Sequence, residues 1–486
     1  MDKGQKRDHK PGLGTSDSAT ERHVVSSREK TKKNREKKLR EKRRPLQHGA
    51  SDDLHFLVSQ LSPHLISLQD LRDLDRVLKY GLKAEAYFAH CPLLYPDAPG
   101  PPWIFPEGTS KLQELNAVLQ TSQDVPTLRV ATNCLVNITS HEDAEWTLHC
   151  MSMLPTCFTL LAQCADSTVR EHIYWALANM CWLQHARDII IANDTIMSAR
   201  SVEPENWTLL QVLSYLFKAL FICHPLPAIE RISTLWHMLV SRLSEAPENM
   251  VHDVYDAVTL MLKGKRDEYK LAIIQDCVFW PHLASLPNIQ CIRILSTLSF
   301  SRATARELVA RGAVQLYVQL LNHPSPEARA EGGLGLSNLA ESGAATAQLL
   351  DTQVLDAVQR QLRYTDVFRV RKQVYWFMCS LLRHAPAPQL GELVVRGYIT
   401  YLVEILRVPG ENTLKSRAMQ ALLRLFQVDE FETRAKLEEA SADYVLHNLS
   451  TDPDLEIEGL ATKLLDLTEK EGERFDLTSS QMNFTF

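Results

Sequence analysis

A short sequence pattern returns about every 40 residues along most of this chain. Each copy has a small or apolar run, then a large residue, and four positions later a small, often polar residue followed by a hydrophobe. Equivalent positions are 137, 179, 219, 260, 297, 338, 380 and 424, and the steps between them run from 37 to 44 residues. Units that recur at a fixed period bury their apolar faces by stacking on one another. The sequence therefore predicts an elongated solenoid of repeats.

Short breaks between helical stretches support this prediction. Gly312 lies within Leu308–Val314 and is expected to end one helix just before the next begins. The two prolines in 323–326 mark a similar break, and strand signals are almost absent. The apolar run Leu209–Cys223 is short for a membrane span and is predicted to be a core helix. Because armadillo repeats have periods of about 40–47 residues, the predicted fold class is all-α, a right-handed armadillo-repeat superhelical solenoid.

The charge of the chain is divided unevenly along its length. Of the 486 residues, the first 50 contain 16 Lys and Arg against 7 Asp and Glu, which gives +9 within a chain of net charge −6. The remainder therefore carries −15. We expect residues 1–50 to be a disordered basic arm, 51–470 to be the solenoid and 471–486 to be a flexible tail. An acidic body should attract such an arm.

Catalytic and metal-binding classes find no support in the motifs. The ten cysteines include no CxxC pair, and Cys150, Cys157 and Cys164 recur at the spacing of buried residues on helices. His141, with Glu142 and Asp143, has no second ligand at zinc-site spacing. No phosphate-binding, dinucleotide or hydrolase motif occurs. We therefore predict a protein that is not an enzyme and needs no cofactor or metal.

The large and the small polar residue of each repeat lie four positions apart, so they share one face of a helix. In the clearest copy these are Trp175 and Asn179. An indole face can hold the aliphatic stem of Lys or Arg, and an amide can hydrogen-bond the backbone of an extended peptide. The alternative is that such residues only pack neighbouring repeats. The run Gly332, Gly333 and Gly335 is predicted to permit close helix packing.

The phrase REHIYWALANM, the repeats and the basic arm resemble the importin-α family of nuclear import adaptors. The resemblance covers nearly the whole chain and implies two grooves for basic nuclear localisation signals of cargo proteins. It also implies residence in cytoplasm and nucleus, with no membrane or small-molecule substrate. The implied major groove comprises Asn133, Asn137, Trp175, Asn179 and Tyr215. The implied minor groove comprises Glu331, Asn338 and Trp376.

Several positions depart from the family pattern. Asn133 stands where the family has its first major-groove tryptophan, and Ala219 replaces an asparagine. Leu183 stands where an acidic residue usually pairs with a lysine of the signal. Leu334 and Ser380 break the minor-groove pattern. The series of large and small polar residues is therefore incomplete at both grooves. The alternative function is that of an armadillo scaffold of another class, such as a cytoskeletal, flagellar or signalling assembly protein.

The segment 28–44 is similar to the importin-β-binding segment of that family. It contains 11 basic and 3 acidic residues, and the resemblance implies that it recruits an importin-β-type carrier or folds back into the cargo groove. The alternatives are a solvated tail and a nonspecific arm that binds polyanions, including nucleic acid. The acidic last repeats, with Asp452, Asp454, Glu456 and Glu458, resemble the region where the family meets its export factor. The arm residues predicted to bind the carrier or the groove are Arg28, Lys32, Lys33, Arg35, Lys37, Lys38, Arg40, Lys42, Arg43 and Arg44.

Overall fold

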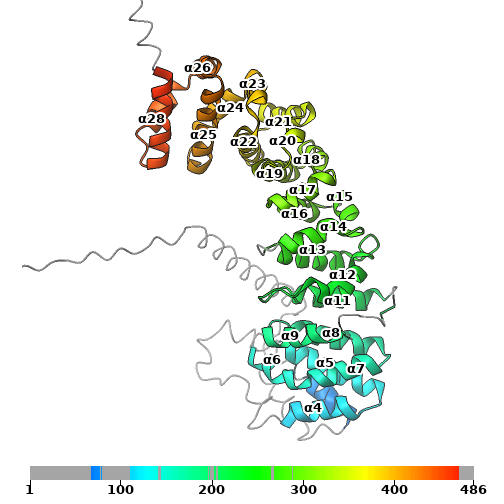
Figure 1. Cartoon of the computed structure of the whole chain (residues 1–486). Helices are drawn as coiled ribbons and strands as arrows, with labels where there is room; N and C mark the ends of the chain where they lie inside the picture. The colour runs from blue at the N-terminus through cyan, green and yellow to red at the C-terminus, as the bar shows by residue number, and fades with distance from the viewer. Residues whose placement is uncertain are drawn as a thin grey trace, which may run out of the picture. The chain divides into compact units, whose positions relative to one another are not determined.

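The computed structural model of the chain is built from helices (Figure 1). It describes residues 67–76, 78, 110–140, 144–194, 196, 202–203, 206–263, 267–286 and 288–469. Within these ranges the regular structure is helical and no strand occurs. The all-α prediction is confirmed. The arm residues, the tail from 471, His141 and the sequence 79–109 lie outside the described ranges.

Contacts divide the chain into two compact units, Met1–Ala176 and Leu177–Phe486. The division falls inside one helix, α8. The first unit contains a helical segment at residues 68–76 and the helices that follow it, and the second contains the remaining helices. Each unit is therefore described by itself.

Among the described residues we call nine helices the ladder helices: the eight that carry a repeat mark, and α28, which packs against the last of them. The eight marked positions fall one by one in the first eight of them, which confirms the repeat prediction. In the second unit α11, α13, α16, α19, α22, α25 and α28 each pack against the next. The ladder helices are α5 (Val125–Thr139), α8 (Ser167–Met180), α11 (Trp207–Ala219), α13 (Glu248–Leu262), α16 (Ile289–Leu298), α19 (Pro326–Ser342), α22 (Phe368–His384), α25 (Asn412–Val428) and α28 (Leu455–Glu469).

The other helices lie between successive ladder helices in the chain, except α4, which precedes α5. In the first unit they are α4 (Ser110–Thr121), α6 (Ala144–Cys150), the short 3-10 helix η1 (Met151–Met153) and α7 (Leu154–Gln163). In the second they are α9 (Gln184–Ala192), α12 (Ile229–Val240), α14 (Asp267–Gln275), α15 (Phe279–Ala284), α17 (Arg302–Ala310), α18 (Ala313–Leu321), α20 (Thr346–Leu349), α21 (Thr352–Tyr364), α23 (Ala387–Val395), α24 (Tyr398–Leu406), α26 (Glu430–Glu439) and α27 (Asp443–Leu449).

The predicted helix breaks are present. Gly312 separates α17 from α18 with a φ of +81°, a left-handed conformation that glycine adopts without steric cost. Gly397 does the same between α23 and α24, also with a φ of +81°. The proline-containing break before α19 places Pro326 in its first turn, where the missing N–H costs nothing.

The glycine run of α19 allows close packing, as predicted. A Cβ on Gly332 would meet Leu320 Cβ at 2.8 Å, and one on Gly335 would enter the ring of Tyr317. Tyr317 is fully buried, and its hydroxyl donates to Leu295 O at 2.7 Å. Gly333 faces α22, where a Cβ would lie 3.0 Å from Gln373 Cβ. These glycines let α19 approach both α18 and α22.

Apolar side chains fill the space between helices. The run Leu209–Cys223, predicted as a core helix, lies in α11 as far as Ala219, and Leu213 and Phe217 of this helix are fully buried. Cys150 and Cys157 are also fully buried, as their spacing suggested, whereas Cys164 is half-buried. Burial of apolar surface at about 25 cal/mol per Å² is the main stabilising contribution in such a stack.

Polar side chains add specific bonds between residues about one repeat apart. Gln361 donates to Leu321 O at 2.8 Å, 40 residues earlier, and the Trp236 indole donates to Asp276 at 2.7 Å, also across 40 residues. Such bonds satisfy polar groups that helix stacking would otherwise bury unpaired. The repeat period therefore appears in the hydrogen bonding as well as in the sequence.

Candidate peptide-binding surfaces

Two predicted groove asparagines in the first unit hold one carboxylate. Asn133 and Asn137 lie on α5, one turn apart, and both donate from Nδ2 to Asp75 Oδ1, at 2.7 and 2.8 Å. Asp75 belongs to the helical segment 68–76 and is half-buried, as are both asparagines. The amide donors therefore fix a negative charge at the α5 surface instead of facing an unoccupied groove.

Trp175 lies on α8 and is half-buried. One turn earlier on the same face is Glu171, which is also half-buried, and burial raises the pKa of its carboxyl group. A cation brought to this face would favour the charged carboxylate and lower that pKa. The α8 surface in the first unit therefore pairs an aromatic face with an acidic group that a lysine could neutralise.

Two predicted groove residues of the second unit contact each other. Asn179 is only 4% exposed, and its Oδ1 accepts a 3.5 Å hydrogen bond from the Tyr215 hydroxyl on α11. The bond joins neighbouring ladder helices. At this point the amide of Asn179 contributes to repeat packing, the alternative role that the sequence left open.

Lys218, next to a repeat mark on α11, forms a charged cluster that the sequence patterns did not reveal. Its Nζ lies 2.9 Å from Asp253 Oδ1 and 2.7 Å from Asp256 Oδ2 on α13. Burial opposes its charge, but the two carboxylates outweigh this effect and raise the pKa of Lys218 above its ordinary value of 10.5. The cluster holds α11 to α13.

Lys218→Met is expected to remove part of the alkaline pH dependence of stability. Because the folded pKa of Lys218 is raised, its contribution is complete below 10.5 and is lost as the pH rises through the folded value. The urea midpoints of the parent protein and of the Lys218→Met variant should therefore converge as the pH rises above 10.5. The double variant Lys218→Met with Asp253→Asn is the control for an unpaired aspartate, and a constant gap at all pH values would contradict the assignment.

The predicted minor-groove residues also have partners within the chain. Glu331 Oε2 accepts from Ser296 Oγ at 2.7 Å, and its Oε1 lies 3.5 Å from Arg369 Nη2. Asn338 Nδ2 donates to Ser296 O and to Ser299 Oγ, both at 3.2 Å. These bonds tie α19 to α16 and α22. Trp376, on α22, is half-buried.

The ladder helices α22 and α25 contain basic residues and no acidic ones. Four lie on α22 and three on α25. Arg424 donates to Leu382 O and Ala385 O at 2.6 Å each, at the end of α22, so it has a structural role. Arg383 Nη1 and Arg417 Nη1 both donate to Glu341 Oε1 on α19, at 2.9 and 3.3 Å. The surface around the predicted minor groove is therefore rich in cations.

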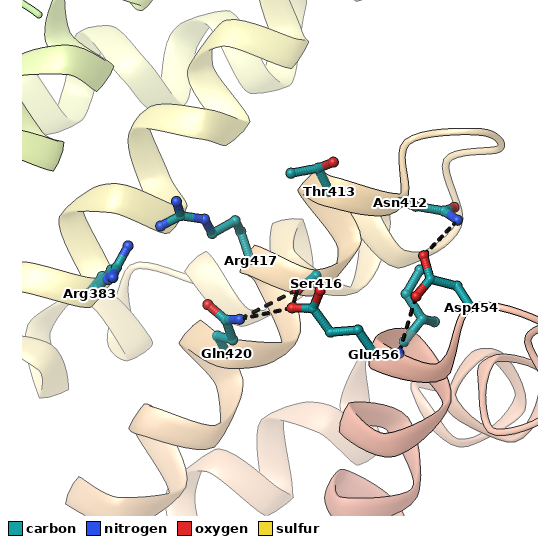
Figure 2. Close-up of a pocket in the computed structure, with 9 residues that line it drawn as sticks. Arg383, Asn412, Thr413, Ser416, Arg417, Gln420, Asp454 and Glu456 are labelled. Carbon is teal, nitrogen blue, oxygen red and sulfur yellow. Dashed lines mark hydrogen bonds between the residues drawn. The ribbon is translucent and has the colours of Figure 1, made fainter. Parts of the chain in front are cut away.

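A pocket of about 340 Å³ opens beside these two arginines. Figure 2 shows Arg383 and Arg417 toward one side of it and Asn412 and Asp454 toward the other. Asn412 Nδ2 donates to Asp454 Oδ2 at 3.3 Å, and Ser416 Oγ donates to Glu456 Oε1 at 2.6 Å. The pocket is polar, with a cationic wall on α22 and α25 and an acidic wall on α28.

Charged residues that the repeat pattern did not single out thus define both the α5 and α8 surface of the first unit and the pocket beside α22 and α25. Asp75, Glu171, Arg383 and Arg417 lie outside the large-and-small pair on which the sequence prediction depended. A count of charges along each ladder helix would have found the basic pair of helices. No sequence signal indicated that Asp75 lies between two asparagines about 60 residues away.

Within the described residues, no group of three or more His, Cys, Asp or Glu side chains could hold a metal ion. In the same part of the chain, none of the helices combines the length and apolar character needed to cross a bilayer.

Solved structures that resemble this chain show its fold. An engineered protein aligns with a TM-score of 0.63 at 18% identity, over 86% of this chain and 99% of that chain. A structure described under "A conserved phosphorylation switch controls the interaction between cadherin and beta-catenin in vitro and in vivo" aligns with a TM-score of 0.54 at 11% identity, over 87% and 88% of the two chains. The fold is an armadillo-type helical solenoid.

Comparison of the amino-acid sequence with known proteins does not assign the chain to a family. No protein-family profile matches the chain, and no curated protein matches it.

Proposed function

We propose that this protein is a non-catalytic adaptor that binds a basic segment of a partner protein, as nuclear import adaptors do. The observation that carries the proposal is the surface of the first unit, where Trp175 lies one turn after Glu171 on α8 and Asp75 is held by two asparagines of α5. The resemblance of REHIYWALANM to importin-α supports the same function. The excess of acidic residues outside residues 1–50 favours a basic partner.

Binding would use three kinds of contact. The indole face of Trp175 would pack along the aliphatic stem of a lysine or arginine of the partner. Its charged end would interact with a half-buried carboxylate such as Glu171, where water screens the attraction less than at an open surface. Asp75 is fixed by Asn133 and Asn137, so a second cation would meet a carboxylate that is already ordered.

The basic arm completes the proposed adaptor. Residues 28–44 would bind an importin-β-type carrier, and without the carrier they would compete with cargo for the acidic body. Deletion of residues 1–50 should then tighten binding of a cargo peptide. The acidic end of the solenoid, with Asp454 and Glu456, is the proposed contact for an export factor. In this proposal the protein acts in both cytoplasm and nucleus.

The double variant Trp175→Ala with Glu171→Gln should weaken binding of a fluorescent lysine-rich signal peptide about tenfold, because it removes one stacking contact and one charge contact. Fluorescence anisotropy would be measured on the full chain and on a chain lacking residues 1–50. The matched control is Tyr364→Ala with Glu392→Gln, an exposed aromatic and an exposed acid outside the ladder helices. Unchanged affinity in the first variant, or equal losses in both, would count against the proposal.

A second candidate function is a scaffold that does not serve transport. It is favoured by the amide of Asn338, whose donors bind α16 instead of facing a peptide. The two functions differ in their use of the arm. Binding of residues 1–50 to a purified importin-β-type carrier would support the adaptor, and no measurable binding would support the scaffold.

A further inference from the structure

The basic surface of α22 and α25 differs in charge from the surface proposed to bind a basic segment. Neither helix contains an acidic residue, and their seven lysines and arginines are partly balanced by acids on neighbouring elements. Arg371 pairs with Glu404 at 2.7 Å, and Lys372 pairs with Glu411 at 2.6 Å. These two cations are therefore neutralised by single partners.

Arg383 and Arg417 are balanced less completely. Both donate to the same oxygen of one carboxylate, Glu341 Oε1, so two positive charges share one negative charge. A guanidinium has five N–H donors, and among the described residues each of these two donates only that single hydrogen bond. Their side chains are 51% and 32% exposed. Donors therefore remain for a group that enters the pocket.

The two arginines also act on two neighbouring titratable groups, His384 and Glu341. Burial is the main cause that lowers the pKa of His384, and Arg383, Arg424 and Arg417 lower it further despite the nearby Glu341. Burial opposes ionisation of Glu341, but the Ser380 hydroxyl and the arginines hold its pKa below the usual range. Glu341 is thus an anion that the arginines already bind.

We propose that the pocket between α22, α25 and α28 binds one anionic side chain, a phosphate or a carboxylate, of an extended segment of a partner protein. Arg383 and Arg417 would donate to its oxygens in the geometry that arginine pairs use for such groups. Thr413, which also lines the pocket, would supply a further polar contact. This surface goes beyond the proposed adaptor function, because a basic signal would not use it.

The opposite wall limits what can bind there. Asp454 and Glu456 line the pocket on the α28 side. A continuous polyanion such as a nucleic acid would meet these carboxylates as it left the arginines, and like charges at close range are unfavourable. A protein segment with a single acidic or phosphorylated residue could place that residue against the arginines and an uncharged part of its chain against the carboxylates.

The test uses three fluorescent decapeptides that differ only at a central position, which is phosphoserine, glutamate or serine, in a glycine and serine background. Anisotropy titrations on the full chain should show the phosphoserine or the glutamate peptide binding at least about tenfold more tightly than the serine peptide. Preference for phosphoserine alone would indicate a phosphorylated partner, whereas equal binding of glutamate would indicate a carboxylate-bearing one. No preference over serine would overturn the proposal.

The variant Arg383→Gln with Arg417→Gln should lose that preference, a weakening of about tenfold. The matched control, Arg360→Gln with Arg363→Gln, removes two exposed arginines of α21 and should bind as the parent does. Equal losses in both variants would show unspecific attraction and reject the pocket. Glu341→Gln keeps both arginines and removes their competing anion, so it should bind the anionic peptide more tightly, and weaker binding would reject the proposal independently.

Discussion

Replacement of Gly335 with alanine is expected to destabilise the second unit by about 2 kcal/mol, although alanine is the better helix former. Alanine gains about 1 kcal/mol over glycine in a helix interior. The added Cβ would enter the ring of Tyr317, which is fully buried, and overpacking of this kind costs about 3 kcal/mol. The free-energy cost of the clash therefore exceeds the gain from the higher helix propensity of alanine.

The ring of Tyr317 cannot move away without a further loss. Its hydroxyl donates to Leu295 O, so a shift would break a buried hydrogen bond between α18 and α16. The measurement is the urea midpoint of unfolding, followed by circular dichroism. Gly391→Ala is the matched control, because Gly391 lies within α23 and nothing stands within 4 Å of a Cβ there. That variant should be more stable by about 1 kcal/mol, and a stabilising Gly335→Ala would refute the packing argument.

Asp276→Ala should have the other large effect, a loss of about 3 kcal/mol. The carboxylate accepts from the Trp236 indole at 2.7 Å and from the backbone N–H groups of Val278 and Phe279 at 2.9 and 2.7 Å. Asp276 is 8% exposed and Phe279 is fully buried. Removal of the acceptor would leave buried donors unsatisfied, which costs about 1–3 kcal/mol for each well-buried group.

The urea midpoint and the tryptophan emission of the variant would check this prediction. Trp236 lies against Phe279, with ring centroids 4.9 Å apart, so loss of its partner should shift the emission as water reaches the indole. Asp366→Ala is the control, because Asp366 is an exposed residue between α21 and α22. If the two variants lost stability equally, the carboxylate would not be the link between α12 and α15.

The fold was predictable because the apolar pattern and the breaks are local properties. The eight repeat marks fall in eight successive ladder helices, and Gly312 adopts the left-handed conformation that ends a helix. The role of the glycines in α19 was also predictable, because a residue without a side chain inside a helix lets a neighbouring helix approach closely. The predicted arm and tail lie outside the described residues. The right-handed superhelical sense remains a prediction.

The binding residues were less predictable, because side-chain partners depend on how neighbouring helices rotate and tilt. The sequence placed Asn133 and Asn137 on one face of a helix, but only the packing of segment 68–76 brings Asp75 between them. Likewise, the i,i+4 spacing cannot show that Asn338 donates to α16. Helix crossing geometry varies by tens of degrees among packed pairs, which is enough to exchange a solvent-facing amide for a bonded one.

The sequence by itself determined the repeat length, the helical class and the placement of the ladder helices, because a period of about 40 residues and its glycine and proline breaks admit few alternatives. It also determined that α22 and α25 carry only basic charges. The tertiary structure alone decided which of those charges are neutralised. Arg383 and Arg417 share Glu341 because α19, α22 and α25 lie side by side, and contacts between residues 42 and 76 positions apart are set by stacking and not by local sequence.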